Sequence, residues 1–256
     1  MFEKTRLFIY LRKILRLWLD RRGYRVQKIG PYSVFDFESF LYRYLEVHKT
    51  LTFLQIGAND GRLNDPIFRF NFENTERVSG FVLEPLPEVF ANLEINYSYT
   101  EKVKAFNLAI HNTATEMNLY RVKPERSGEL ADFAKGIASF DSEHWKKSKL
   151  VPDISFMESV LVKCISLNNF LDANKITNLD LLVLDTEGFD FEILFNMDFG
   201  KIKPKIIRFE HGIRDGVMST GNFKILCTKL NEVGYQIIAE SYDATAYLLD
   251  PLDLVF

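Results

Sequence analysis

Residues 53–61 constrain the fold of this chain more than any other stretch. An apolar run ends there at two glycines four residues apart, Gly57 and Gly61, with Asn59 and Asp60 between them. A strand that ends in such a turn is typical of open α/β sheets, in which ligands bind beyond the carboxyl ends of the strands. The spacing matches neither Gly-x-Gly-x-x-Gly nor Gly-x4-Gly-Lys-Ser/Thr, which argues against a dinucleotide site or a P-loop.

The composition is that of an ordinary globular protein. The chain has 256 residues, of which 47% are hydrophobic and 26% charged, enough for a sizeable core. A net charge of −3 gives no reason to expect nucleic acid as a partner. The two cysteines, Cys164 and Cys227, have no CxxC spacing, so neither a zinc site nor a disulfide framework is expected, and a reducing compartment such as the cytoplasm fits best.

Residues 1–28 form a basic segment on an otherwise acidic chain. Nine Lys and Arg residues against two acids give it a net charge of +7, which leaves −10 for the remainder. Apolar residues near a 3.6-residue spacing predict an amphipathic helix. They are Leu7, Leu11, Ile14, Leu15 and Trp18. The cations could contact anionic lipid headgroups, or the apolar stripe could pack on the domain with the charges in solvent. Basic residues interrupt the segment, so neither a membrane-spanning helix nor a signal peptide is expected.

From residue 51 onward, segments of strand and helix character alternate. The predicted strands cover residues 52–56, 79–83, 104–108, 117–122, 159–164, 181–184, 206–209, 235–239 and 246–249. This alternation predicts an α/β domain with a mainly parallel sheet and helices on both faces. The last two strands are close enough for an antiparallel hairpin at the sheet edge, and the strand at 117–122 is expected to pair near the one at 104–108.

Residues 123–158 lack clear periodicity, and a loop of this length is typical of a functional segment. Residues 136–145 within it are a candidate acceptor lid, because aromatic and hydroxyl side chains suit a sugar face. The lid side chains are Ser139, Phe140, His144 and Trp145. For the whole chain we expect two parts, an N-terminal helical extension at residues 1–48 and one α/β domain at residues 49–256.

Acidic or small residues follow five predicted strands at the edge where ligands bind. They are Gly57 to Gly61, Glu84, Asn107 with Ala109 and Ile110, Asp185 to Gly188, and Glu210 to Gly212. Glu84 lies 23 residues after Gly61, a position from which a carboxylate can accept hydrogen bonds from both hydroxyls of a ribose. The alternative for Glu84 is a solvent-facing residue at the start of a loop.

Taken together, these motifs resemble the FkbM family of S-adenosylmethionine-dependent methyltransferases, which are usually O-methyltransferases. The matching motifs are Leu54-Gln55-Ile56-Gly57-Ala58-Asn59-Asp60-Gly61, Leu83-Glu84-Pro85-Leu86-Pro87, Leu93 with Asn96, Ala109-Ile110, and Leu184-Asp185-Thr186-Glu187-Gly188-Phe189-Asp190. The resemblance implies a class I methyltransferase (Rossmann-like) fold with a seven-stranded, mostly parallel sheet whose last strand is antiparallel. Gln55 departs from the family pattern, since many members have an acid there.

The resemblance also implies S-adenosylmethionine as the cofactor and assigns residues to it. Gly57, Ala58, Asn59, Asp60 and Gly61 would line its methionine and ribose portions. Glu84, followed by Pro85, would bind the ribose hydroxyls, and Asn107 and Ala109 would lie near the adenine. Asp185 would face the methyl group.

Methyl transfer to a hydroxyl requires an acceptor in line with the S–CH3 bond and often a base for its proton. Asp185 is the first candidate for this base, because it directly follows a strand, and His211 and Glu187 are the alternatives. Asp185, Glu210 and His211 could instead hold a divalent cation. Their spacing matches no dedicated metal motif, so no metal is expected.

We therefore expect an O-methyltransferase, and the resemblance alone implies a sugar of a surface glycan or glycolipid as the acceptor. Such an enzyme would serve polysaccharide biosynthesis in the cytoplasm or at the inner membrane face, with residues 1–28 as the membrane contact. Two alternatives stay open: O-methylation of a small natural product, and a non-catalytic module that binds the cofactor. A NAD-dependent dehydrogenase is disfavoured by the missing third glycine.

Overall fold

The computed structural model describes residues 35–62, 65–130, 136–148 and 151–248. The helix expected within residues 1–28 lies outside them. The chain divides into two compact units, residues 1–36 and 37–256, and every described helix and strand lies in the second. The first of these helices is α2 (Phe37–His48), whose Tyr44 hydroxyl donates to Asp180 Oδ1 over 2.7 Å. This helix therefore belongs to the α/β unit, although its residues were assigned to the extension from sequence.

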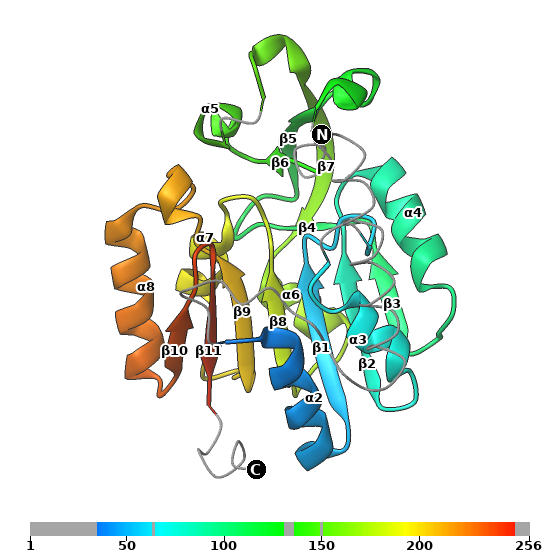
Figure 1. Ribbon diagram of the computed structural model, residues 1–256, viewed down its shortest axis with the longest axis vertical. Helices are drawn as coiled ribbons and strands as arrows, with labels where there is room; N and C mark the ends of the chain where they lie inside the picture. The colour runs from blue at the N-terminus through cyan, green and yellow to red at the C-terminus, as the bar shows by residue number, and fades with distance from the viewer. Residues whose placement is uncertain (1–34, 63–64, 131–135, 149–150, 249–256) are drawn as a thin grey trace, which may run out of the picture. The chain divides into compact units, whose positions relative to one another are not determined.

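A seven-stranded sheet forms the centre of the second unit (Figure 1). The strand order is β10-β11-β9-β8-β1-β2-β3. The strands are β1 (Leu51–Ile56), β2 (Val78–Leu83), β3 (Val103–Phe106), β8 (Leu181–Leu184), β9 (Ile206–Glu210), β10 (Gln236–Ala239) and β11 (Asp243–Tyr247). Neighbouring strands from β3 to β9 pair in parallel, and β11 pairs antiparallel with both β9 and β10. The predicted class I methyltransferase fold is confirmed, with the last strand inserted between β9 and β10, so that β10 is the edge.

Helices cover both faces of this sheet, which explains why its central strands are mostly apolar. All four residues of β8 are buried. In β1, Leu54 and Ile56 share one apolar core with α6 (Leu167–Ala173), α7 (Asp190–Asn196) and α8 (Thr220–Glu232). Figure 1 shows α2 and α3 (Phe68–Glu73) in front of the sheet and α6 behind it. No helix of the described residues is long and apolar enough to cross a membrane.

A second, smaller sheet lies beyond the carboxyl ends of the large one (Figure 1). Its order is β4-β7-β5-β6, with β4 (Ala109–Ile110), β5 (Glu116–Val122), β6 (Ala138–Ser139) and β7 (Met157–Ile165). β5 pairs with β7 along its whole length, from Glu116 opposite Lys163 to Val122 opposite Met157. The expectation that this strand pairs near β3 was therefore wrong. We call β5, β6, β7, the short helix α5 (His144–Ser148) and residues 140–143, which join β6 to α5, the cap.

Candidate active site

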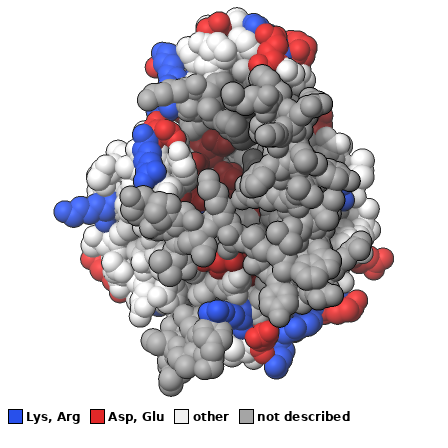
Figure 2. Space-filling model, viewed as in Figure 1, with Lys and Arg blue, Asp and Glu red and all other residues white. Residues whose placement is uncertain are grey.

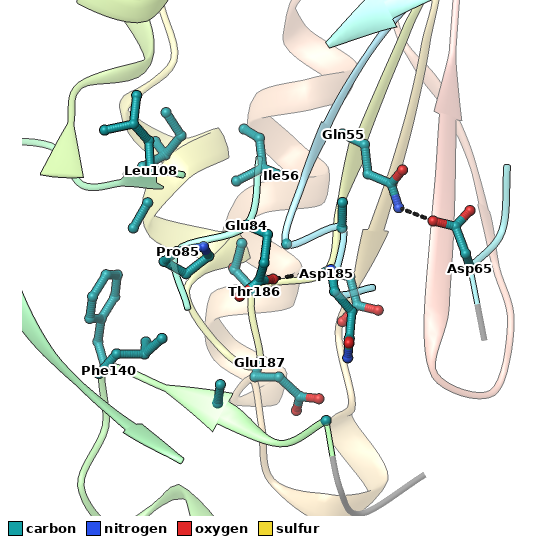
Figure 3. Close-up of a pocket in the computed structure, with 18 of the residues that line it drawn as sticks. Gln55, Ile56, Asp65, Glu84, Pro85, Leu108, Phe140, Asp185, Thr186 and Glu187 are labelled. Carbon is teal, nitrogen blue, oxygen red and sulfur yellow. Dashed lines mark hydrogen bonds between the residues drawn. The ribbon is translucent and has the colours of Figure 1, made fainter. Parts of the chain in front are cut away.

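A cavity opens where the carboxyl ends of β1, β2 and β8 meet the cap (Figure 3). Its volume is about 910 Å³, counting the open mouth. The lining from the large sheet includes Gly57, Ala58, Asn59, Glu84, Pro85, Asp185, Thr186 and Glu187, and the cap adds Leu119, Ala138 and Phe140. Figure 2 shows Asp and Glu atoms inside a hollow in the upper central part of the face in view. The site predicted at the strand ends is thus a real cavity, roofed by a sheet that the sequence did not predict.

The glycine turn after β1 lies in direct backbone contact with the end of β8. Gly57 has a φ of +81°, and a Cβ built on it would overlap the carbonyl oxygen of Asp185. The amides of Gly57 and Ala58 both donate to the carbonyl of Leu83, at 3.0 and 2.9 Å. Only glycine permits this approach, because any side chain would force the two strand ends apart. Ala58 and Asn59 are thereby placed on the cavity wall.

Asp60 and Gly61 shape this turn and do not line the cavity. A Cβ at Gly61 would lie 2.7 Å from both Leu93 Cδ1 and a ring carbon of Tyr97, so the turn packs tightly on helix α4 (Pro87–Tyr97). Asn96 Nδ2, from the same helix, donates to the carbonyl of Asp60 over 2.8 Å. The Leu93 and Asn96 positions of the family pattern therefore hold the glycine turn in place.

Glu84 is a buried carboxylate with a fixed orientation. Only 5% of the residue is exposed, and its Oε1 accepts from Leu86 N at 2.8 Å while Oε2 accepts from Asn59 N at 3.1 Å. Burial raises the pKa of Glu84 to about 7, although these two hydrogen bonds oppose the shift. Asn107 does not line the cavity; its Nδ2 donates to the carbonyls of Glu84 and Pro85, both at 2.9 Å. Asn107 was expected near the adenine, and it instead supports the backbone of Glu84 from outside the cavity.

The turn after β8 carries two acids into the cavity. Asp185 is solvent-accessible at the cavity wall although protein surrounds it on most sides, and burial together with the nearby carboxylates of Glu187 and Asp190 raises its pKa well above the ordinary value. Glu187 has a φ of +50°, and its Oε2 lies 3.1 Å from His144 Nε2 of the cap. Ser139 Oγ donates to the Glu187 carbonyl over 2.7 Å. The candidate lid residues Ser139 and His144 therefore contact the site itself.

The buried Asp190 carboxylate holds the turn after β8 through hydrogen bonds. This role was not predicted from the sequence. Asp190 is the first residue of α7 and only 1% exposed. Its carboxylate accepts from the Thr186 amide at 2.9 Å, from the Thr186 hydroxyl, and from the Glu210 amide at 2.8 Å. Burial raises the pKa of Asp190 to about 6. The signal in the sequence was an acid at the start of a helix, two residues after Gly188.

Gln55, the departure from the family pattern, is buried and donates through Nε2 to Asp65 Oδ2 over 3.0 Å (Figure 3). Asp65 in turn accepts from the amides of Ile67 and Phe68 at the start of α3. A neutral amide at position 55 therefore matches the carboxylate opposite it, where an acid would face a like charge.

The sequence also matches a known protein-family profile. The profile described as "Methyltransferase FkbM domain" matches residues 55–237, which include the glycine turn, Glu84 and the turn after β8. The chain belongs to the FkbM methyltransferase family. It is therefore an S-adenosylmethionine-dependent methyltransferase, as its motifs indicated.

Solved structures resemble this FkbM methyltransferase only distantly. Precorrin-6y C5,15-methyltransferase from Geobacter metallireducens is 11% identical, with a TM-score of 0.41 over 86% of this chain and 93% of that one. The Methanococcus jannaschii fibrillarin pre-rRNA processing protein is 13% identical, with a TM-score of 0.41 over 87% and 81% of the two chains. A sequence comparison with functionally characterised proteins gave no significant match.

The chemistry of the cavity lining fits S-adenosylmethionine. Glu84 presents a buried carboxylate of fixed orientation, and the absence of a side chain at Gly57 lets the backbone line the wall. Of the residues expected at the cofactor, Gly57, Ala58, Asn59, Glu84, Pro85, Ala109 and Asp185 line the cavity.

His211 is placed away from the cavity. It is buried, its Nε2 lies 3.3 Å from the Glu240 carbonyl, and its Nδ1 accepts from the Ile213 amide at 3.3 Å. Burial also lowers the pKa of His211. Because both ring nitrogens face backbone partners, we do not assign His211 the role of base. Asp185 and Glu187 are the candidates that line the cavity.

The alternative cation site finds no support in the described residues. No three His, Cys, Asp or Glu side chains of residues 35–62, 65–130, 136–148 and 151–248 are grouped so that they could hold a metal ion. Asp185, Glu210 and His211 therefore do not form one. Glu210 is held instead in a crowded, largely buried position, where burial and the carboxylates of Glu187 and Asp185 raise its pKa to about 10.

Proposed function

We propose that this FkbM methyltransferase methylates a hydroxyl group of a sugar in a surface glycan or glycolipid. The observation that carries the proposal is the position of Asp185 and Glu187, which line the same cavity as Glu84 and the glycine turn. Carboxylates accept hydrogen bonds from hydroxyl groups and can take up their protons, which suits transfer to oxygen. The choice of a sugar rests on the likeness to FkbM O-methyltransferases.

The cavity has two chemically different sides, which suggests how the cofactor would lie. Figure 3 shows Leu108 and Phe140 on one side and Asp185 and Glu187 on the other. We propose that the apolar side receives the adenine, that Glu84 binds the ribose hydroxyls, and that the acidic side faces the acceptor. When bound, S-adenosylmethionine supplies an activated methyl group on a sulfonium.

In this arrangement the chain's own residues position the acceptor and hold its proton. Asp185, with its raised pKa, accepts a proton more readily than an exposed aspartate. The cap limits access of water from the side of β6, where Ala138 and Phe140 line the cavity. Asp190 and Ser139 keep the turn after β8 in one conformation through their hydrogen bonds.

The test is methyl transfer by the full chain from isotope-labelled S-adenosylmethionine to a panel of oligosaccharides, lipid-linked saccharides and hydroxylated natural products. We expect labelled methyl ethers on a saccharide, stable to mild alkali and identified by mass spectrometry. Methylation confined to the natural products would favour the second candidate, an enzyme of small-molecule biosynthesis. Tight cofactor binding without turnover on any acceptor would favour the third, a non-catalytic module.

We further propose that the enzyme works in the cytoplasm at a membrane surface, to which residues 1–28 would bind. The net charge of +7 on this segment and its amphipathic pattern support the proposal, since such helices bind anionic lipid. A lipid-linked saccharide would then be presented at the same surface.

A further inference from the structure

The acid of the β8 turn that faces the cap, Glu187, is held by two cap residues. His144 Nε2 lies 3.1 Å from Glu187 Oε2, and Ser139 Oγ donates to the Glu187 carbonyl over 2.7 Å. These cap residues are 43 and 48 positions away in the sequence. Both the carboxylate and the backbone of Glu187 are therefore held by the cap, the first from helix α5 and the second from strand β6.

Glu187 needs such support because its backbone is in the left-handed region, where side chains are disfavoured. Its φ is +50°, and that of the following Gly188 is +104°. Strained conformations of this kind persist where neighbouring groups hold them, and they concentrate at functional sites. In this conformation the Glu187 side chain contacts the cap, and the residue also lines the cavity.

His144 is suited to orient this carboxylate and has no access to bulk solvent. Its side chain is 2% exposed, whereas that of Glu187 is 29% exposed. The contact to a carboxylate oxygen assigns a proton to His144 Nε2, because a carboxylate can only accept. The imidazole also lies against Gly188, where a Cβ would stand 3.7 Å from His144 Nδ1. Burial of His144 fixes the direction of its N–H, and Glu187 stays accessible from the cavity.

We infer that His144 is a positioning residue that holds the Glu187 carboxylate at the acceptor end of the cavity. The inference rests on the proposed function, which takes the acidic side of the cavity as the methyl end. It gives the two acids of the β8 turn different roles: Glu187, held by the cap, positions the acceptor hydroxyl, and Asp185, whose backbone carbonyl lies against Gly57, remains the proton acceptor.

Two cofactor analogues test this without knowledge of the acceptor. S-adenosylhomocysteine lacks the transferred methyl group, and sinefungin carries an amine on a carbon that replaces the sulfonium. A carboxylate at the methyl end should favour the sinefungin amine and contribute little to S-adenosylhomocysteine. The ratio of the two dissociation constants, measured by calorimetry on the full chain, therefore reports on the acids at the methyl end, and Glu187→Gln isolates the part due to Glu187. A merely structural role of His144 would change both constants together.

Four variants isolate the pair. His144→Leu removes the donor and keeps the bulk, His144→Gln retains an N–H donor, and Glu187→Gln removes the charge. Lys147→Met is the matched control, because Lys147 lies on the same short helix but pairs with Asp141. We expect His144→Leu and Glu187→Gln each to weaken sinefungin about tenfold relative to S-adenosylhomocysteine, as for loss of one charge-assisted hydrogen bond. His144→Gln should stay within about threefold of the wild type, and Lys147→Met should leave the ratio unchanged.

The double variant decides whether His144 acts through Glu187. In the Glu187→Gln background, His144→Leu should cause no further change in the ratio. Equal weakening of both analogues by His144→Leu, or an effect that persists without the Glu187 charge, would overturn the inference and leave the proposed function standing. Failure of the wild-type chain to bind either analogue would overturn both.

Discussion

The backbone of Gly57 lies so close to the carbonyl oxygen of Asp185 that no Cβ fits between them. This contact joins the ends of the neighbouring strands β1 and β8, which pair in parallel with Ile56 opposite Leu184. The turn that lines the cofactor wall and the turn that carries the cavity acids are therefore one packed unit. A substitution that moves the backbone of one turn should therefore also displace the other.

Gly57→Ala should disrupt this unit. The new methyl group would meet backbone atoms that cannot rotate away, and a φ of +81° is unfavourable for alanine. We expect a loss of about 2–4 kcal/mol in the free energy of unfolding and no measurable S-adenosylhomocysteine binding. Gly128→Ala is the control, since nothing lies within 4 Å of a Cβ there, and it should change stability by less than about 0.5 kcal/mol. Equal stability of the two variants in thermal and urea unfolding would contradict the contact.

Glu84 should make the free protein more stable in mild acid. Its pKa rises from 4.5 to about 7 on folding, so the folded state binds this proton more tightly than the unfolded state. The resulting stabilisation is complete below the unfolded value of 4.5 and is lost as the pH rises through about 7. The shift corresponds to at most about 3 kcal/mol. Between pH 7.5 and pH 5, wild type should gain stability relative to Glu84→Gln in urea unfolding; a parallel response would refute the shift.

Cofactor binding should have the opposite pH dependence. Binding of the ribose hydroxyls requires the ionised form of Glu84, which is depleted below a pH of about 7. The affinity for S-adenosylhomocysteine should therefore fall up to about tenfold per pH unit below that value. Glu84→Gln should bind at least about tenfold more weakly at pH 8 and lose most of this dependence. Calorimetry across the pH range measures both, and an unchanged profile in the variant would exclude Glu84 as its source.

Asn107→Ala should weaken cofactor binding without removing a cavity residue. Its side-chain amide donates to the backbone carbonyls of Glu84 and Pro85, and both carbonyls lose this hydrogen bond in the variant. We expect a loss of about 1–3 kcal/mol in stability and a weaker affinity for S-adenosylhomocysteine. Asn92→Ala is the matched control, because Asn92 donates to Glu88 on an exposed helix surface, and it should stay within about 0.5 kcal/mol of the wild type.

The membrane proposal predicts a difference between the full chain and a chain that lacks residues 1–28. The full chain should co-sediment with vesicles that contain anionic phospholipid, and this binding should weaken as salt is raised. The truncated chain should remain in the supernatant, as should the full chain with neutral vesicles. Equal co-sedimentation of the full and the truncated chain with anionic vesicles would contradict the proposal.

Much of the large sheet could be predicted from sequence, because each of its strands has a recognisable local pattern of apolar residues. β8 was located at its observed bounds, since a strand buried on both faces is a continuous apolar run between polar turns. The two long strands of the cap were located near their observed bounds, but their pairing into a separate sheet was not predicted, because it joins Glu116 to Lys163 across an irregular segment. The hydrophobic pattern within a strand does not indicate which distant strand will pair with it.

The site residues likewise fall into those predicted from sequence and those found only in the structure. Gly57, Glu84 and Asp185 were identified from sequence, because residues that directly follow parallel strands converge at one sheet edge whatever the rest of the chain does. Only the tertiary structure showed that Asn107 and Asp190 support the site from behind, that His211 faces backbone groups elsewhere, and that His144 reaches Glu187. Local sequence thus determined which groups stand at the strand ends. Contacts between residues far apart in the chain decided which of them the protein holds in place, because hydrogen-bond partners are set by packing and not by spacing.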